Sequence, residues 1–197
     1  MGDVLLVRHG ETRWSLSGQH TSYTDLPLTP HGEEQAKSLA PLLSRRTFAA
    51  VRTSPLARAV RTAELAGLSG AVPDEDLHEW DYGGYEGVST ADIHRDRPGW
   101  DLWTDGVPPG PEGHPGESAE QVGRRADRVL ARVRADLARG DGDVVLVAHA
   151  HFLRVLTARW LGLPPVEGRL FRLETGTVSR LSTEHDRPVI AEWNTRP

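Results

Sequence analysis

Cysteine is absent from this chain of 197 residues. Its absence excludes disulfides, thiolate metal sites and cysteine nucleophiles. Long apolar runs are absent as well, since no stretch approaches the roughly 20 residues that cross a bilayer. The N-terminus enters strand-like sequence without a charged segment and a long apolar stretch before it, so we expect no secretion signal. We therefore expect a cytoplasmic protein without a membrane partner.

Positive charge is scarce, because 23 lysines and arginines face 28 acidic residues and give a formal net charge of −5. A general nucleic-acid surface needs clustered positive charge, so we expect no nucleic-acid partner. A small anionic ligand is compatible with this balance, because a few local arginines can outweigh it. The length suits one domain with a single core, and we expect that domain to span residues 1–197.

Strand-like and helical patterns alternate along the chain. Residues 4–7 and 143–148 are near-continuous apolar runs, which are typical of central parallel strands covered on both faces. The alternation predicts an α/β fold, a three-layer sandwich in which helices flank a mostly parallel central sheet. Shorter strand-like pieces are predicted at 48–53, 170–173, 177–182 and 189–193.

Helix starts are marked at three places. The pairs Thr29-Pro30 and Ser54-Pro55 have the order of a helix cap followed by the first helical residue. The helix that opens at Ser54 is predicted to run to about residue 66. A capping box at 118–121 predicts the start of a helix that ends near residue 140.

The least regular stretch lies at about 88–116. Its first part, 89–97, favours a short helix, whereas 99–116 contains four prolines together with Trp100 and Trp103. A long connection inside a compact domain is more often a functional lid than a linker. We therefore predict a lid-like insertion at 88–116, with the two tryptophans packing in the lid or the core.

Polar residues follow both apolar runs directly. Arg8, His9 and Gly10 come after the first run, and His149 comes after the run at 143–148. In an α/β protein, ligands bind just beyond the carboxyl ends of parallel strands. Gly10 is expected to permit a sharp turn that a residue with a Cβ would resist. The sequence therefore places these side chains where chemistry usually occurs.

The segment Arg8-His9-Gly10-Glu11-Thr12 resembles the signature of the histidine phosphatase superfamily, the phosphoglycerate mutase-like proteins. Other segments resemble the superfamily in the same order along most of the chain. They are the helix start at 28–36, the segment at 54–63, the acid-bearing loop at 77–83 and the strand with the second histidine at 147–149. Five such segments in the right order make the resemblance specific.

The resemblance implies a phosphoglycerate mutase-like fold and a phosphoryl-transfer enzyme that works through a phosphohistidine. It also implies that no metal and no other cofactor is needed. Members of the family are often monomers or dimers, so we expect a monomer or a homodimer. The implied partner is a small phosphorylated metabolite.

The chemistry of phosphate esters agrees with the residues at these positions. Arg8 and Arg58 would neutralise the phosphate dianion and match its oxygens. His9 would be the nucleophile, and His149 would donate to a phosphoryl oxygen. Glu79 would act as general acid and then as general base. Because its first role needs a protonated carboxyl, we expect activity to favour acid pH.

Further candidates for binding the phosphate or the substrate follow from the same segments. Ser15, Gln19 and Thr21 lie in the loop after the nucleophile, Tyr82 lies in the acid-bearing loop, and Ala150 follows the second histidine. Two of these positions depart from the family. Ser15 stands where asparagine is common, and Ala150 stands where glycine is common. A serine hydroxyl still donates one hydrogen bond, although it is shorter than an amide.

Two other groups of residues have competing interpretations. His20 and His151 would either line the pocket or lie on the surface. The arginines at 124–125, 132 and 134 are expected to form the solvated face of a helix.

Hydrolysis is the predicted reaction, on a small phosphomonoester such as a sugar phosphate or a phosphoglycerate-like compound. The segments at 79–87 and 116–118 resemble the acid-phosphatase and sugar-bisphosphatase branch. The alternative is a 2,3-bisphosphoglycerate-dependent mutase, which must retain a bisphosphate and would need more basic residues in the lid. Between Gly87 and Gly116 the arginines are Arg95 and Arg97, and acidic residues outnumber them.

Two interpretations of these residues that do not involve phosphoryl transfer are less favoured. A metal site is disfavoured because the sequence lacks a motif such as HExxH, and two arginines at the site would repel a cation. A phosphate-binding regulatory module would need neither His9 nor Glu79. Removal of phosphate from a protein histidine or serine stays open.

Overall fold

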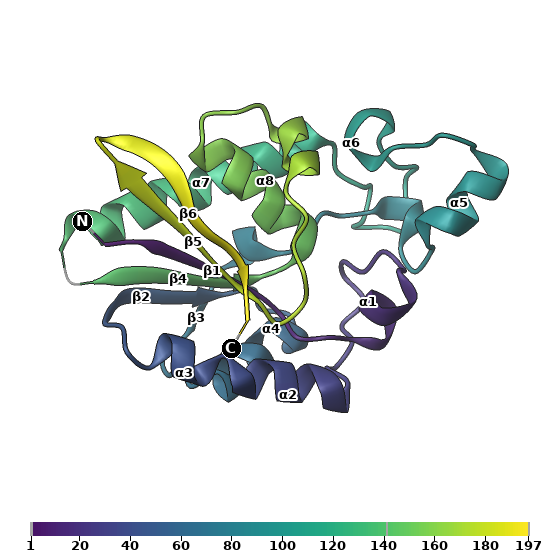
Figure 1. Ribbon diagram of the computed structural model, residues 1–197. Helices are drawn as coiled ribbons and strands as arrows, with labels where there is room; N and C mark the ends of the chain where they lie inside the picture. The colour runs from purple at the N-terminus through teal and green to yellow at the C-terminus, as the bar shows by residue number, and fades with distance from the viewer. Residues whose placement is uncertain (1, 141, 197) are drawn as a thin grey trace.

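The computed structural model describes residues 2–140 and 142–196. Within them the strands are β1 (Val4–Arg8), β2 (Phe48–Thr53), β3 (Val72–Pro73), β4 (Asp143–Ala148), β5 (Val178–Glu184) and β6 (Arg187–Thr195). They form one sheet in the order β3-β2-β4-β1-β5-β6 (Figure 1). The pairs β1–β4, β2–β4 and β2–β3 are parallel, whereas β5 and β6 add an antiparallel edge. The predicted α/β fold with a mostly parallel sheet is confirmed.

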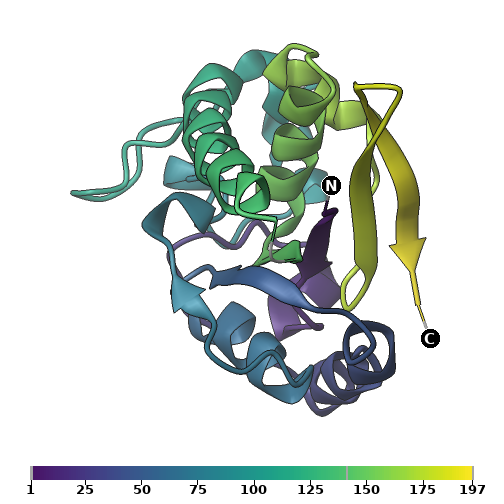
Figure 2. The same cartoon turned by 90° about the vertical axis from the view of Figure 1, so that its left-hand side faces the viewer.

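Helices cover both faces of this sheet. They are α1 (Arg13–Ser17), α2 (Pro30–Ser38), α3 (Ala40–Leu43), α4 (Ala57–Leu65), α5 (Thr90–Asp96), α6 (Leu102–Asp105), α7 (Ala119–Ala138) and α8 (Ala150–Trp160). The green helices α7 and α8 lie above the sheet in Figure 2, and the blue helices α2, α3 and α4 lie below it. No helix in the described ranges is long and apolar enough to cross a bilayer.

Alternation along β1 divides the core into two parts. Val4 and Leu6 belong to the cluster that contains the apolar faces of α7 and α8. Leu5 and Val7 belong to the cluster that contains α4 and the end of α2. Successive side chains of a strand point to opposite faces, so one apolar run supplies both layers. The run is continuous because both faces are buried.

The predicted helix caps are confirmed at two of three places. The Thr29 hydroxyl accepts the Gly32 N–H at 3.0 Å, and Pro30 is the first residue of α2. Residues 118–121 form the predicted capping box of α7. The third helix start was wrong, because α4 begins at Ala57 and has Leu56 as its N-cap. The Ser54 hydroxyl instead lies 2.8 Å from His149 Nε2.

The strand predicted at 170–173 is absent from the described structure. A 3-10 helix, η3 (Pro165–Leu170), occupies its first residue, and an irregular segment follows. The Leu173 carbonyl accepts a hydrogen bond from Arg8 Nη1 at 2.5 Å. This segment therefore crosses the end of β1 and bonds a side chain instead of joining the sheet.

The segment at 88–116 contains α5 and α6 and lies beyond the ends of β1 and β4 (Figure 1). Ile93, Trp100 and Leu102 from this segment belong to the same buried cluster as α7 and α8. The Trp100 indole N–H donates to the Gly106 carbonyl at 2.8 Å, which ties the segment to itself. Its role as a lid stays a prediction.

Candidate active site

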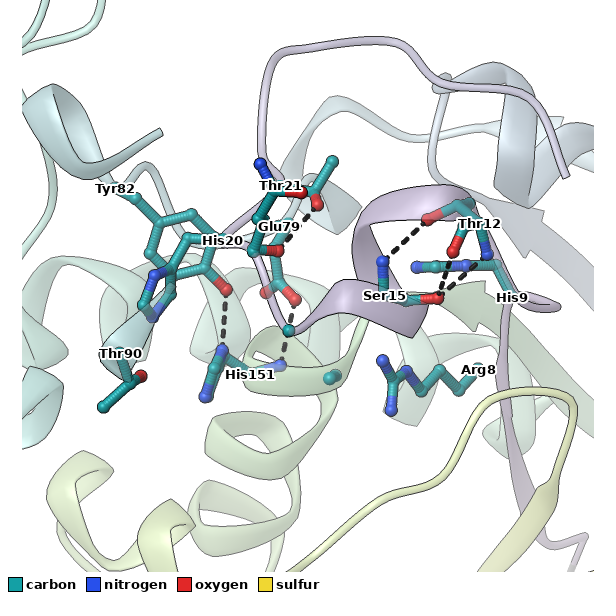
Figure 3. Close-up of a pocket in the computed structure, with 13 residues that line it drawn as sticks. Arg8, His9, Thr12, Ser15, His20, Thr21, Glu79, Tyr82, Thr90 and His151 are labelled. Atoms are coloured by element: carbon teal, nitrogen blue, oxygen red, sulfur yellow. Dashed lines mark hydrogen bonds between the residues drawn. The ribbon is translucent and has the colours of Figure 1, made fainter. Parts of the chain in front are cut away.

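A pocket opens at the carboxyl ends of β1 and β4, between these strand ends and the loops before α2 and α5 (Figure 3). Polar side chains make up most of its wall. The lining residues are Arg8, His9, Thr12, Ser15, Gly18, Gln19, His20, Thr21, Glu79, Tyr82, Thr90, Ala150 and His151. The pocket thus contains eight of the ten residues singled out in the sequence; Arg58 and His149 lie outside its lining.

Strand register brings the two histidines together. The parallel ladder pairs Val7 with Val147 and Arg8 with Ala148, so the next residues of both strands are His9 and His149. Their ring centroids are 5.0 Å apart. Because side chains alternate along a strand, both histidines continue the face that carries α4.

Gly10 is required for a reason other than the expected turn. Its φ is not positive, so a left-handed backbone does not explain the glycine. A Cβ built there would lie 2.2 Å from the Gly32 carbonyl oxygen, at the start of α2. The chain after His9 therefore lies directly against α2, and a larger residue would push the two apart.

His9 is a neutral imidazole, and its Nε2 has no hydrogen-bond partner among the described residues. It is 6% exposed, and its Nδ1 lies 2.7 Å from the Gly10 carbonyl oxygen, which can only accept a hydrogen bond. Burial, together with the charges of Arg58 and Arg8, holds the pKa of His9 well below its usual range. Nδ1 therefore carries the proton, and the lone pair lies on Nε2. This is the form in which a histidine acts as a nucleophile.

Arg8 provides an unsatisfied donor beside His9. Its Nη1 donates to the Leu173 carbonyl, whereas its buried Nε has no hydrogen-bond partner within the described residues. Arg8 also lines the pocket, so its positive charge lies where an anionic ligand would bind. Figure 3 shows the Arg8 guanidinium at the same end of the pocket as His9 and Ser15.

Arg58 and His149 lie behind His9. Arg58 is fully buried, and its Nη groups donate to the backbone carbonyls of residues 21, 22 and 24. Its Nε donates to His149 Nδ1 at 3.2 Å, and His149 Nε2 lies 2.8 Å from the Ser54 hydroxyl. Both nitrogens of His149 are thus occupied. Direct contact of Arg58 and His149 with a phosphoryl group stays a prediction.

The Glu79 carboxylate is held by backbone donors. Its Oε1 accepts the N–H groups of Trp80 and Phe152, each at 2.8 Å, and its Oε2 accepts that of His151 at 3.0 Å. Two of these donors belong to the first turn of α8, where the helix dipole favours a negative charge. In Figure 3 Glu79 lies between the end with His9 and the end with Tyr82.

The three predicted side-chain donors line the pocket but bond within the protein. The Ser15 hydroxyl donates to the Thr12 carbonyl at 3.0 Å and accepts the Thr12 N–H. Gln19 Nε2 donates to the Gly87 carbonyl at 2.7 Å, and the Thr21 hydroxyl donates to the Gln19 carbonyl at 3.0 Å. These contacts shape the loop after the nucleophile. Any role of these hydroxyls and this amide in binding phosphate stays a prediction.

The end of the pocket away from His9 is formed by two histidines and a tyrosine. His20 and His151 both line it, and their rings are 6.5 Å apart at 23° to one another. The Tyr82 hydroxyl lies 2.6 Å from His151 Nδ1, and His20 Nδ1 lies 2.6 Å from the Val88 carbonyl oxygen. The surface alternative for the two histidines is therefore wrong.

Three residues of the site were not predicted from the sequence. Thr12 and Thr90 line the pocket, and Ser54 holds His149. Ser54 belongs to the segment that resembles the superfamily, so its motif was a signal that could have identified it. Thr90 had no signal, because it reaches the pocket only through the folding of the segment at 88–116.

One arginine of α7 was wrongly assigned to a solvated face. Arg125 donates to the backbone carbonyls of Asp76, His78 and Glu79 at 2.8–3.2 Å. It also forms an ion pair of 2.7 Å with Glu117. Arg125 therefore fixes the loop that carries Glu79. Arg132 is likewise paired, with Asp74 and Asp76.

Metal ligands are not gathered at this site. Across residues 2–140 and 142–196, no three histidine, aspartate or glutamate side chains are arranged to hold a metal ion.

Known proteins of one family resemble the chain over most of its length. Residues 4–196 match the histidine phosphatase superfamily (branch 1). An acid phosphatase of Mycobacterium tuberculosis is 40% identical over 184 residues, which cover 92% of this chain and 87% of the relative. A sedoheptulose 1,7-bisphosphatase of Saccharomyces cerevisiae is 37% identical over 189 residues, which cover 81% of this chain and 67% of the relative.

A solved structure is also similar. The product of an open reading frame of Mycobacterium tuberculosis superposes with a TM-score of 0.91 at 38% identity, covering 99% of this chain and 98% of that one. The resemblance of the five sequence segments is thereby confirmed, and the chain belongs to branch 1 of the histidine phosphatase superfamily as a phosphatase.

Proposed function

We propose that this phosphatase hydrolyses small phosphomonoesters in two steps, through a phosphohistidine on His9. The observation that carries the proposal is a neutral His9, with its proton on Nδ1 and its lone pair on Nε2, in a pocket that Arg8 also lines. A nucleophile and a cation in one pocket suit an incoming phosphoryl group. The similarity to an acid phosphatase supports the same reaction class.

In the first step, the lone pair of His9 Nε2 forms a bond to phosphorus as the ester P–O bond breaks. The leaving oxygen takes a proton from Glu79, and Arg8 offsets the negative charge of the phosphoryl oxygens. In the second step, Glu79 takes a proton from water as that water attacks phosphorus and the P–N bond breaks. The carboxyl gains in the second step the proton that it gave in the first, so the cycle balances.

A mutase has less support than a hydrolase. Retaining a second phosphate would need cations at the far end of the pocket, where His20, Tyr82 and His151 lie. The two arginines of the lid-like segment bond elsewhere: Arg95 pairs with Asp92 at 2.8 Å, and Arg97 donates to the Tyr85 hydroxyl. Both are outside the lining of the pocket.

The test is phosphate release from p-nitrophenyl phosphate and other small monoesters, with EDTA present, between pH 4 and 8. We expect release by the wild type that increases toward acid pH and is abolished in His9→Ala. His185→Ala, an exposed change in the turn between β5 and β6, is the matched control and should retain activity. Release that survives in His9→Ala would exclude the phosphohistidine route. A 3-phosphoglycerate isomerisation that exceeds hydrolysis would favour the mutase.

A further inference from the structure

The pocket continues past Glu79 into a second hollow. His20, Thr90 and His151 line both parts, and Trp100 and Trp103 form walls of the outer part. In Figure 3 the labelled residues of this end lie on the far side of Glu79 from His9 and Arg8. A phosphate held at His9 would therefore direct its leaving group toward this hollow.

His20 presents a hydrogen-bond acceptor to the hollow. Its Nδ1 is 2.6 Å from the Val88 carbonyl oxygen, so Nδ1 must carry the proton. Burial lowers the pKa of His20 below its usual value, which leaves the ring neutral at neutral pH. Its Nε2 then has a lone pair, and within the described residues this nitrogen has no hydrogen-bond partner.

His151 presents the complementary donor. Its Nδ1 is 2.6 Å from the Tyr82 hydroxyl, which forms no other hydrogen bond in the part of the chain described. Burial raises the pKa of Tyr82 well above its usual range and lowers that of His151 well below. A phenol that keeps its proton beside a neutral imidazole donates to Nδ1. The proton of His151 is therefore on Nε2, which has no described partner.

Charged groups around this hollow are already paired. Arg154 donates to the carbonyls of Gly168 and Arg169 and lies over the Trp103 ring, with its guanidinium carbon 4.8 Å from the centroid. Arg169 forms an ion pair of 3.3 Å with Glu167. Asp101 accepts the Trp103 N–H as the cap of α6. Arg169 and Asp101 line the outer part of the hollow, and its inner part offers neutral donors, neutral acceptors and aromatic faces.

We propose that His20 and His151 form a specificity pair that binds neighbouring hydroxyl groups of an uncharged polyol as the leaving group. This inference rests on the proposed hydrolysis at His9. A hydroxyl both donates and accepts, so it satisfies His20 Nε2 and His151 Nε2–H, whereas an alkyl group leaves both unpaired. A carboxylate or second phosphate would bring negative charge toward Glu79, and the nearby Arg154 and Arg169 already bond groups of the protein. The tryptophan faces suit the CH groups of such an alcohol.

Three monoesters of similar size test the pair. Glycerol 1-phosphate has two hydroxyls, propyl phosphate has none, and 3-phosphoglycerate replaces the terminal hydroxymethyl group by a carboxylate. We expect kcat/KM for glycerol 1-phosphate to exceed that for propyl phosphate at least about fivefold, because two hydrogen bonds of ordinary strength are lost. It should also exceed that for 3-phosphoglycerate.

Asparagine variants isolate the free nitrogens. In His20→Asn and His151→Asn the amide can keep the Nδ1 contact while Nε2 is lost, so the ratio of glycerol 1-phosphate to propyl phosphate should fall roughly two- to tenfold in each. Tyr82→Phe keeps the ring and removes only the hydroxyl that orients His151, and should lower the ratio too. His185→Asn, in the exposed turn between β5 and β6, is the matched control, since asparagine tolerates its positive φ of 49°.

The outcomes separate the two proposals. If the wild type does not hydrolyse p-nitrophenyl phosphate, hydrolysis at His9 itself fails. If it does, but handles propyl and glycerol phosphates equally well, or prefers 3-phosphoglycerate, the specificity pair is wrong and the proposed hydrolysis stands. An unchanged ratio in both asparagine variants would also overturn the pair, because the preference would then come from other groups.

Discussion

His9 and His149 occupy equivalent places after neighbouring strands, yet their neighbours give them opposite states. The Gly10 carbonyl accepts a hydrogen bond from His9 Nδ1–H, so the lone pair of His9 lies on Nε2. Arg58 donates to His149 Nδ1, so the proton of His149 lies on Nε2 and points to Ser54. The same residue type thus presents a lone pair at one strand end and a fully bonded ring at the other.

The Ser54 hydroxyl matters because His149 is completely buried. In Ser54→Ala the His149 Nε2–H would lose its acceptor, and an unsatisfied buried donor costs about 1–3 kcal/mol. We expect the free energy of unfolding to fall by that amount in urea denaturation. Ser44→Ala, on the exposed end of α3, is the control. Equal stability of the two variants would show that His149 finds another partner.

Residue types at the site could be predicted, but their bonding could not. The order of the five segments placed Arg8, His9 and Glu79 around one pocket, and the structure brings these three together. The proton positions of the histidines depend on carbonyls and hydroxyls contributed by distant segments. Gly10 is an example. A glycine is required there because the Gly32 backbone, 22 positions further along the chain, leaves no room for a Cβ.

At the scale of elements, α7 acts on the site as well as on the core. Its apolar stripe includes Val122, Ala126 and Val129, all buried against the sheet. Arg125 lies next to this stripe and donates to the carbonyls of His78 and Glu79, so it holds the loop that carries Glu79. Helix periodicity predicts the stripe. It could not predict that one flanking arginine meets a loop, because loop paths leave no periodic signal.

Replacement of Arg125 by methionine keeps most of the aliphatic stem and removes the charge. The carbonyls that it bonds and the Glu117 carboxylate would then lose their donor. We expect kcat for p-nitrophenyl phosphate to fall by about tenfold or more, since a small displacement of a catalytic group is costly. Arg124→Met, an exposed change one residue earlier, is the matched control. A loss confined to KM would assign Arg125 to substrate binding instead of to positioning Glu79.

The edges of the sheet were harder to predict than its centre. The runs that became β1 and β4 are continuous because helices cover both faces, so their type and place were predicted correctly. β5 and β6 were expected as strands, but their antiparallel direction depends on a hairpin turn at His185 and Asp186, both with positive φ. Residues 170–173 do not join the sheet, and two of their carbonyls accept from side chains instead: that of Leu173 from Arg8 and that of Arg172 from Trp193 and Asn194.

For the whole molecule, the buried histidines tie stability to pH. Burial is the largest cause that lowers the pKa values of His9, His20, His149 and His151. Below about pH 6.5 the unfolded chain takes up protons that the folded chain does not. The free energy of unfolding should therefore fall as the pH drops below 6.5, by about 1.4 kcal/mol per pH unit for each histidine that stays neutral.

Urea denaturation at pH 7.5, 6.5 and 5.5 measures this slope. The variant His151→Asn should reduce it by about 1.4 kcal/mol per pH unit, because one neutral histidine is gone. The non-titrating Ser44→Ala change should leave it as in the wild type. A free energy of unfolding that is constant from pH 7.5 to 5.5 would contradict the neutral state of these rings.

The alternation along β1 has a consequence for how this chain can change over time. Odd-numbered positions, Leu5 and Val7, lead to His9, and even-numbered positions, Val4 and Leu6, lead to Arg8. Loss of a single codon within this strand would exchange the two series, so that core residues would face the wrong layer and His9 the wrong side of the sheet. The strand can therefore accept substitutions one at a time but not a change in its length. The same alternation of side chains sets both the two core layers and the positions of Arg8 and His9.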